Sequence, residues 1–146
     1  MESGGTATAV DSRVRSLAAL YFGGHAVVDL AWWLVVATVG SIRGRFELDP
    51  AHHRVLDGFF VPDMVMLGAL SCLVAIGIHR RWRGGVVLAA VVTGGSAYVT
   101  LYLAGWIARG GHGWMGVVAM TTETALMAIF VAALARAPQA TPATAA

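Results

Sequence analysis

Two acidic side chains inside long apolar stretches are the residues of this chain best suited to chemistry. Asp29 lies near the middle of the apolar run 17–39, and Glu123 lies near the middle of the run 114–135. An ionised carboxylate at the centre of a membrane-spanning helix costs about 2.5–3.5 kcal/mol on insertion scales. We therefore expect at least one of the two acids to be protonated at neutral pH. One acid would then serve as a general acid and the other as a base or counter-ion.

His25 precedes Asp29 by four residues, so both lie on one face if the run is helical. Trp32 and Trp33 continue that face by one turn. We expect His25 to relay a proton to Asp29 and the indole rings to stabilise positive charge through their π faces. In the alternative interpretation, His25 is a packing residue and the two acids are neutral, satisfied by hydroxyl groups of neighbouring helices.

Two tyrosines in the third apolar run are candidates for binding a ligand. Tyr98 is too deep for the aromatic belt at the membrane surface, so we expect its hydroxyl to contact Asp29 or Glu123. Tyr102 follows one turn later and also fits the belt. The glycine pair 94–95 precedes both tyrosines and would allow another helix or a ligand to approach the backbone closely.

Two methionines and a third acid complete the candidate binding residues. Met120 and Met127 flank Glu123 on one helical face and would line an adaptable apolar pocket, although methionine stripes are also common in plain packing. Asp63 follows Pro62 at the start of the second run. We interpret Asp63 first as an acid that answers the helix dipole, and second as part of the ligand site.

The sequence lacks the motifs of metal and cofactor sites. His52, His53 and His112 have none of the spacings, such as H-x₃-H, that bring three or four metal ligands together. The single Cys72 excludes an intramolecular disulfide and a cysteine-based zinc motif. There is also no P-loop, dinucleotide fingerprint or nucleophile elbow. We expect no bound metal and no cofactor.

The composition places these residues in a polytopic membrane protein. Of the 146 residues, 58% are hydrophobic and only 12% are charged, against about 25% charged residues in ordinary soluble domains. A helix of about 20 apolar residues spans the hydrocarbon core of a bilayer. We predict an all-α fold, an up-down bundle of four transmembrane helices joined by short loops. The predicted helices cover residues 17–39, 59–79, 86–107 and 114–135, within one domain over 16–136.

The segments outside the bundle are short. Residues 1–15 and 137–146 are rich in small and polar residues, so we predict disordered tails and no cleaved signal peptide. The first loop, 40–58, is the longest. There Asp49 would cap a short interfacial helix that begins with Pro50.

Arginine is the only basic residue besides histidine, which is typical of a GC-rich bacterial genome and does not indicate a nucleic-acid partner. Positive residues are enriched on the cytoplasmic side of membrane proteins. Six arginines flank the predicted termini and second loop, and four flank the other side. This distribution predicts a cell-membrane protein with both termini in the cytoplasm. The first group is Arg13, Arg15, Arg80, Arg81, Arg83 and Arg136; the second is Arg43, Arg45, Arg54 and Arg109.

The segment Leu20-Tyr21-Phe22-Gly23-Gly24-His25, followed by Asp29, resembles the first helix of the EXPERA family. That family includes emopamil-binding sterol isomerases and the sigma-2 receptor. The resemblance implies isomerisation of an allylic double bond through a carbocation, or binding of sterol-like and cationic amphiphilic ligands. It maps the family's first-helix acid onto Asp29 and its second acid onto Asp57 or Asp63. This chain differs in carrying its second deep acid, Glu123, in the fourth run.

These observations support three functional hypotheses. In the leading one, the bundle encloses a pocket for an isoprenoid-like or sterol-like small molecule, which Asp29 and Glu123 isomerise or cyclise. In the second, the same acids bind a proton or cation in a small transporter or channel subunit, and a homo-oligomer completes the pathway. In the third, the chain is an accessory subunit that recruits a partner through the glycines of its third helix.

Overall fold

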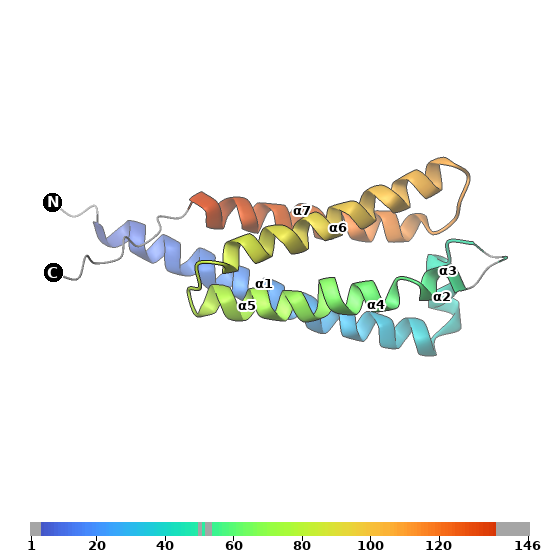
Figure 1. The fold of residues 1–146 in the computed structure, drawn as a ribbon, viewed down its shortest axis with the longest axis horizontal. Helices are drawn as coiled ribbons and strands as arrows, with labels where there is room; N and C mark the ends of the chain where they lie inside the picture. The colour runs from blue at the N-terminus through green and yellow to red at the C-terminus, as the bar shows by residue number, and fades with distance from the viewer. Residues whose placement is uncertain (1–3, 50, 52–53, 137–146) are drawn as a thin grey trace.

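The computed structural model describes residues 4–49, 51 and 54–136, and no strand occurs among them (Figure 1). Four helical stretches are long and apolar enough to cross a membrane: Asp11–Thr38, Arg54–His79, Gly85–Ala108 and Trp114–Arg136. The predicted all-helical class and the four spans are confirmed. The spans are formed by α1 (Gly4–Thr38), by α3 (Arg54–Asp57), α4 (Phe60–Asp63), η1 (Met64–Ala69) and α5 (Leu70–His79) together, by α6 (Gly85–Ala108) and by α7 (Trp114–Arg136).

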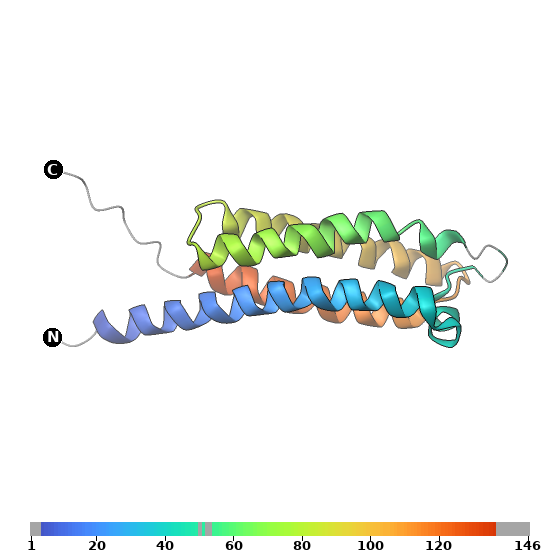
Figure 2. The ribbon, with the colours of Figure 1, turned by 90° about the horizontal axis from the view of Figure 1, so that it is seen from below.

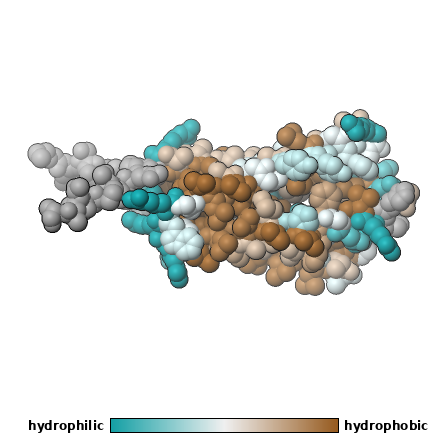
Figure 3. Space-filling view, in the orientation of Figure 1, coloured by the Kyte–Doolittle hydropathy of each residue, from teal (hydrophilic) through white to brown (hydrophobic). Residues whose placement is uncertain are grey.

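The spans lie side by side in an elongated bundle. Figures 1 and 2 show consecutive spans running in alternate directions, with the two ends of the described chain at the same end of the molecule. α1 contacts α5 and α7, and α6 contacts the same two helices. On the face drawn in Figure 3, hydrophobic side chains dominate the middle of the bundle and hydrophilic ones gather toward its ends. This distribution is that of a multi-pass membrane protein.

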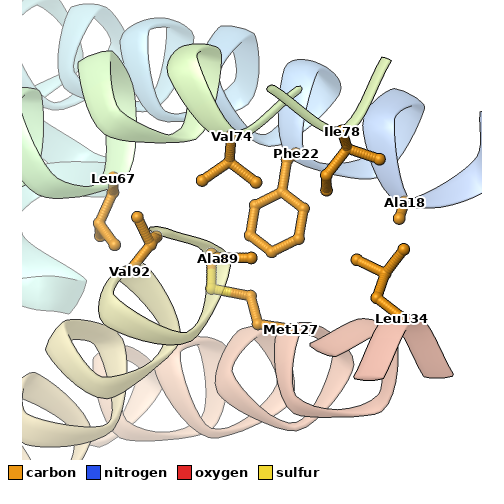
Figure 4. Close-up of a cluster of buried hydrophobic side chains, with 9 residues drawn as sticks. All are labelled: Ala18, Phe22, Leu67, Val74, Ile78, Ala89, Val92, Met127 and Leu134. Carbon is orange, nitrogen blue, oxygen red and sulfur yellow. The ribbon is translucent and has the colours of Figure 1, made fainter. Parts of the chain in front are cut away.

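The main core lies where all four spans meet (Figure 4). Phe22 of α1 sits at its centre, fully buried, with Val74 of α5 and Met127 of α7 around it. Met127 therefore packs in the core. Its position on the same helical face as Glu123 had instead suggested that it lines a ligand pocket. The whole cluster comprises Ala18, Phe22, Leu67, Val74, Ile78, Ala89, Val92, Met127 and Leu134.

The first helix begins earlier than predicted. α1 starts at Gly4, so the prediction of a disordered tail is wrong for residues 4–15. Two contacts stabilise the helix there, one with the core and one within the helix itself. Val14 packs against the main core, and Arg15 forms an ion pair with Asp11 one turn earlier, with Nε and Oδ1 3.0 Å apart. Residues 1–3 and the predicted tail 137–146 lie outside the described residues.

The first loop contains a short helix that the sequence did not suggest, α2 (Gly40–Phe46). Arg43 on this helix contacts Asp57 at 2.8 Å and Glu47 at 3.5 Å. The hydrogen bond to Asp57 raises the pKa of the Arg43 guanidinium above its ordinary value, so Arg43 stays charged.

The segment after α2 is tied to the far end of α6. Leu48 is buried, and its carbonyl accepts hydrogen bonds from Trp106 Nε1 at 2.8 Å and His112 N at 3.2 Å. Asp49 accepts a hydrogen bond from the backbone N–H of Ala51, which is the contact of an Asx-turn. Pro50, His52 and His53, which would begin the predicted interfacial helix, lie outside the described residues.

The second span is not one regular α-helix. Residues Met64–Ala69 form a π-helix between α4 and α5. A π-turn contains an extra residue, and such turns are frequent at functional sites. Met66 of this segment packs against Gly95 of α6, where an added Cβ would lie 2.9 Å from the Met66 Cε. The predicted close approach of a neighbour at the glycine pair is therefore seen at Gly95, whereas a Cβ at Gly94 would meet open space.

Candidate functional site

Three acids from three different spans face the same region of the bundle interior. Asp29 of α1 is 6% exposed, and Glu123 of α7 is also largely buried. Asp63, the last residue of α4, interacts electrostatically with Asp29, and Glu123 interacts with both. The structure thus brings together the two deep acids singled out by the sequence and adds Asp63 to them.

Asp63 lies in the first turn of α4, where an acid answers the helix dipole as predicted, but it does not cap the segment that follows. α4 begins three residues before it, and its carboxylate makes no capping hydrogen bond to the helix that follows. Instead its carboxyl group interacts with the indole of Trp33. The Trp33 N–H is buried and has no partner within hydrogen-bond geometry. Asp63 therefore belongs to the interior acid group.

His25 lies beside Glu123, and its contact with an acid is there rather than with Asp29. The distance between His25 Nε2 and Glu123 Oε1 is 3.6 Å, and no closer partner satisfies that nitrogen. Tyr21 stacks on the imidazole with ring centroids 6.3 Å apart, and its hydroxyl donates to the backbone carbonyl of Glu123 at 3.3 Å. These contacts fix the histidine ring next to the acid.

A network of hydroxyl groups supports Glu123 from the other side. Ser96 Oγ, fully buried on α6, lies 3.0 Å from Glu123 Oε1 and 2.7 Å from Thr124 Oγ1. Thr124 Oγ1 is 3.0 Å from Thr100 Oγ1, which donates to the Ser96 carbonyl at 2.9 Å. Sequence reasoning missed these three residues as site residues. The available signal was the four-residue spacing of Ser96 and Thr100, which puts two hydroxyls on one face of the third span.

Asp29 differs from Glu123 in its surroundings. Its Oδ2 is buried and has no hydrogen-bond partner. This oxygen lies against the π-helix, since a Cβ added at Gly68 would be 3.4 Å away from it. The hydroxyl of Ser71, also fully buried, has no partner either. Buried polar atoms of this kind are rare and often mark functional positions.

The remaining predicted binding residues lie elsewhere. Tyr98 is 71% exposed on the outside of the bundle, so the expected contact of its hydroxyl with Asp29 or Glu123 is absent. Tyr102 packs on a phenylalanine ring at the start of the second span, and Trp32 packs on one in α2. Met120 and Met127 pack in or against the main core. Of the predicted binding residues, only Trp33 and Asp63 lie with the acids.

An open groove between α1 and α7 leads from the outer surface to Glu123 and His25. Its volume is about 580 Å³. Leu20 at its rim is 73% exposed and Val28 is 64% exposed, so the rim belongs to the surface that lipid chains would cover. The lining residues are Leu20, Tyr21, Gly24, His25, Val28, Ala119, Thr122, Glu123 and Leu126.

Among the described residues, no three histidine, cysteine or acidic side chains are arranged to hold a metal ion. Comparison with protein-family models, curated proteins and solved structures gives no match to this chain.

Proposed function

We propose that this chain takes up a hydrophobic, isoprenoid-like or sterol-like molecule from the membrane and acts on it by acid–base chemistry, isomerising or cyclising it. The observation that carries this proposal is the groove between α1 and α7. Its rim is apolar and open to the bilayer, and its inner wall contains Glu123 and His25. A lipid-soluble molecule can reach these two groups without crossing a polar surface.

In this proposal Glu123 is the general acid. The network around it has four contacts: Thr100 to the Ser96 carbonyl, Thr100 to Thr124, Thr124 to Ser96, and Ser96 to Glu123. Three hydroxyl groups supply only three protons. All four contacts are hydrogen bonds if the fourth proton comes from the carboxyl group of Glu123. The network therefore suits a neutral Glu123 that can deliver a proton into the groove.

Asp29 and Asp63 have a different role in the proposed reaction. Both interact electrostatically with Glu123, so a carboxylate in this pair would stabilise a carbocation formed after protonation. The indole of Trp33 lies with them and would add stabilisation through its π face. His25 would remove a proton from the carbocation at the end of the reaction and return it to the Glu123 carboxylate, whose Oε1 lies 3.6 Å from His25 Nε2. The EXPERA-like segment of α1 is consistent with such carbocation chemistry.

A matched pair of glycine substitutions tests the groove. Gly24 lines the groove, and a Cβ added there meets nothing within 4 Å. Gly94 on α6 has equally open space but lies outside the groove. Wild type, Gly24→Leu and Gly94→Leu are each extracted in mild detergent, and bound lipids are identified by mass spectrometry. We expect one specific isoprenoid or sterol-like species with wild type and Gly94→Leu, and its loss from Gly24→Leu. Only bulk phospholipid in all three would overturn the proposal.

A small proton- or cation-coupled transport subunit is the second candidate. It is favoured by the buried Asp29 Oδ2, which lacks a partner and faces the π-helix. Irregular helical segments beside buried acids are typical of ion sites in transporters. Four spans leave little room for a gated pathway within one chain, so this function requires a homo-oligomer. Native mass spectrometry that detects monomer alone would count against it. In either case we propose that both termini are cytoplasmic, as the arginine distribution predicts.

A further inference from the structure

A second, polar cleft lies at the opposite end of α1 from α2. Its volume is about 200 Å³. Residues of this cleft belong to the start of the first membrane span and the end of the second, so the cleft lies at one edge of the apolar belt. The lining residues are Ser12, Arg15, Ser16, Ile78, His79 and Arg81.

Arg81 has an unusual backbone conformation in this cleft. Its φ is 56°, and it is the one non-glycine residue with positive φ among those described. The N–H of Trp82 bonds to the Gly77 carbonyl, and the N–H of Arg81 bonds to the Ile78 carbonyl. This pattern is the Schellman motif that ends many helices, and its left-handed position is normally glycine. An arginine there is disfavoured, and such outliers are a reason to look for a function.

The surroundings of Arg81 are strongly positive. Arg15 lines the same cleft, and its Nε is held by Asp11 at 3.0 Å, which fixes the guanidinium in position. Asp11 is the one acid at this end among the described residues. The arginines here are Arg13, Arg15, Arg80, Arg81, Arg83 and Arg136, whereas at the other end Glu47, Asp49 and Asp57 offset most of the positive charge.

We propose that this cleft binds the phosphate of an anionic phospholipid, held between the guanidinium groups of Arg15 and Arg81. Arginine suits phosphate because its planar fork donates two parallel hydrogen bonds. The hydroxyl of Ser16 is available as a further donor at the cleft wall. The position at the membrane edge favours a lipid head group over a soluble phosphate. This site is separate from the groove between α1 and α7 and does not depend on the function proposed for that groove.

Native mass spectrometry of the full chain tests the site. The detergent-solubilised protein is titrated with phosphatidylglycerol, and phosphatidylcholine serves as the reference lipid. Arg81→Gly removes the guanidinium and gives the left-handed position its preferred residue. We expect phosphatidylglycerol affinity to fall about tenfold, because the variant loses charge-assisted hydrogen bonds from the guanidinium to the phosphate. The melting temperature of the lipid-free protein should stay the same or rise, because glycine adopts this conformation without strain.

Arg83→Gln is the matched control, since Arg83 carries the same charge at the same end but does not line the cleft. Its affinity for phosphatidylglycerol should change less than twofold. An unchanged affinity in Arg81→Gly would overturn the proposal. An equal loss in both variants would also overturn it, because the binding would then follow from the general charge of this end. Displacement of the lipid by millimolar inorganic phosphate would instead identify a site for soluble phosphate.

Discussion

Ser96→Ala should destabilise the bundle by roughly 1–3 kcal/mol. Ser96 Oγ contacts Glu123 Oε1 and Thr124 Oγ1, and both contacts join α6 to α7. Interhelical hydrogen bonds in membrane proteins contribute about 0.6 kcal/mol on average and up to about 1.7 kcal/mol. Loss of two such bonds gives the expected range. Glu123→Gln should differ, because the amide N–H supplies the fourth proton of the network in place of the carboxyl O–H. We expect its stability to lie within about 0.5 kcal/mol of wild type.

Reversible unfolding in mixed micelles with increasing dodecyl sulfate, followed by circular dichroism, measures these differences. Thr121→Ala is the control, since the Thr121 hydroxyl donates to the carbonyl of Val117 on its own helix at 2.7 Å and joins no other helix. Infrared spectroscopy supplies a second measurement, because a neutral Glu123 gives a carboxylic-acid carbonyl band that disappears in Glu123→Gln. If Glu123 were ionised, Ser96 would donate a charge-assisted bond of about 1.5–3 kcal/mol to it. A loss of that size in Glu123→Gln, with no change in the infrared band, would refute the proton count.

Two further predictions concern the end of the bundle near α2. Gly113→Ala should cost about 2–4 kcal/mol in unfolding free energy, because φ is +88° and an added Cβ would lie 2.8 Å from Leu48 Cδ2. Gly110→Ala, with φ +84° and open space, should cost only about 1–2 kcal/mol, and equal costs would show that the Leu48 contact is unimportant. Trp106→Phe should increase hydrogen exchange at the amides of residues 46–49, because the bond to the Leu48 carbonyl is lost. Unchanged exchange there would mean that other contacts hold the segment.

The membrane spans could be predicted from the sequence because length and hydropathy alone define them. The depth of Asp29 and Glu123 followed from their positions within the apolar runs. The direction in which each side chain points could not be predicted. The spans are apolar around most of their circumference, so no polar stripe marks the side that faces the bundle interior. Tyr98 was placed inside by depth alone, and it lies on the outside.

Other parts of the site depend on contacts that the sequence does not encode locally. The hydroxyls of Ser96 and Thr124 matter because α6 and α7 pack at that level, which is known only once the helices are paired. The π-helix over Met64–Ala69 has no signal in the hydropathy pattern. The start of α1 was misjudged because small and polar residues resemble a linker, although Val14 and the Asp11–Arg15 pair stabilise a helix there.

The π-helix also determines how many acids share the interior. An α-helix turns by about 100° per residue about its axis. The extra residue of a π-turn therefore rotates the side chains that precede it about the helix axis by that angle. Asp63 directly precedes Met64–Ala69 and interacts with Asp29 in the present arrangement. Regular α geometry in this turn would rotate Asp63 away from Asp29 by more than a quarter of a circle. A local change of helical winding, without any movement of α1 or α7, would therefore change the buried charge around Glu123.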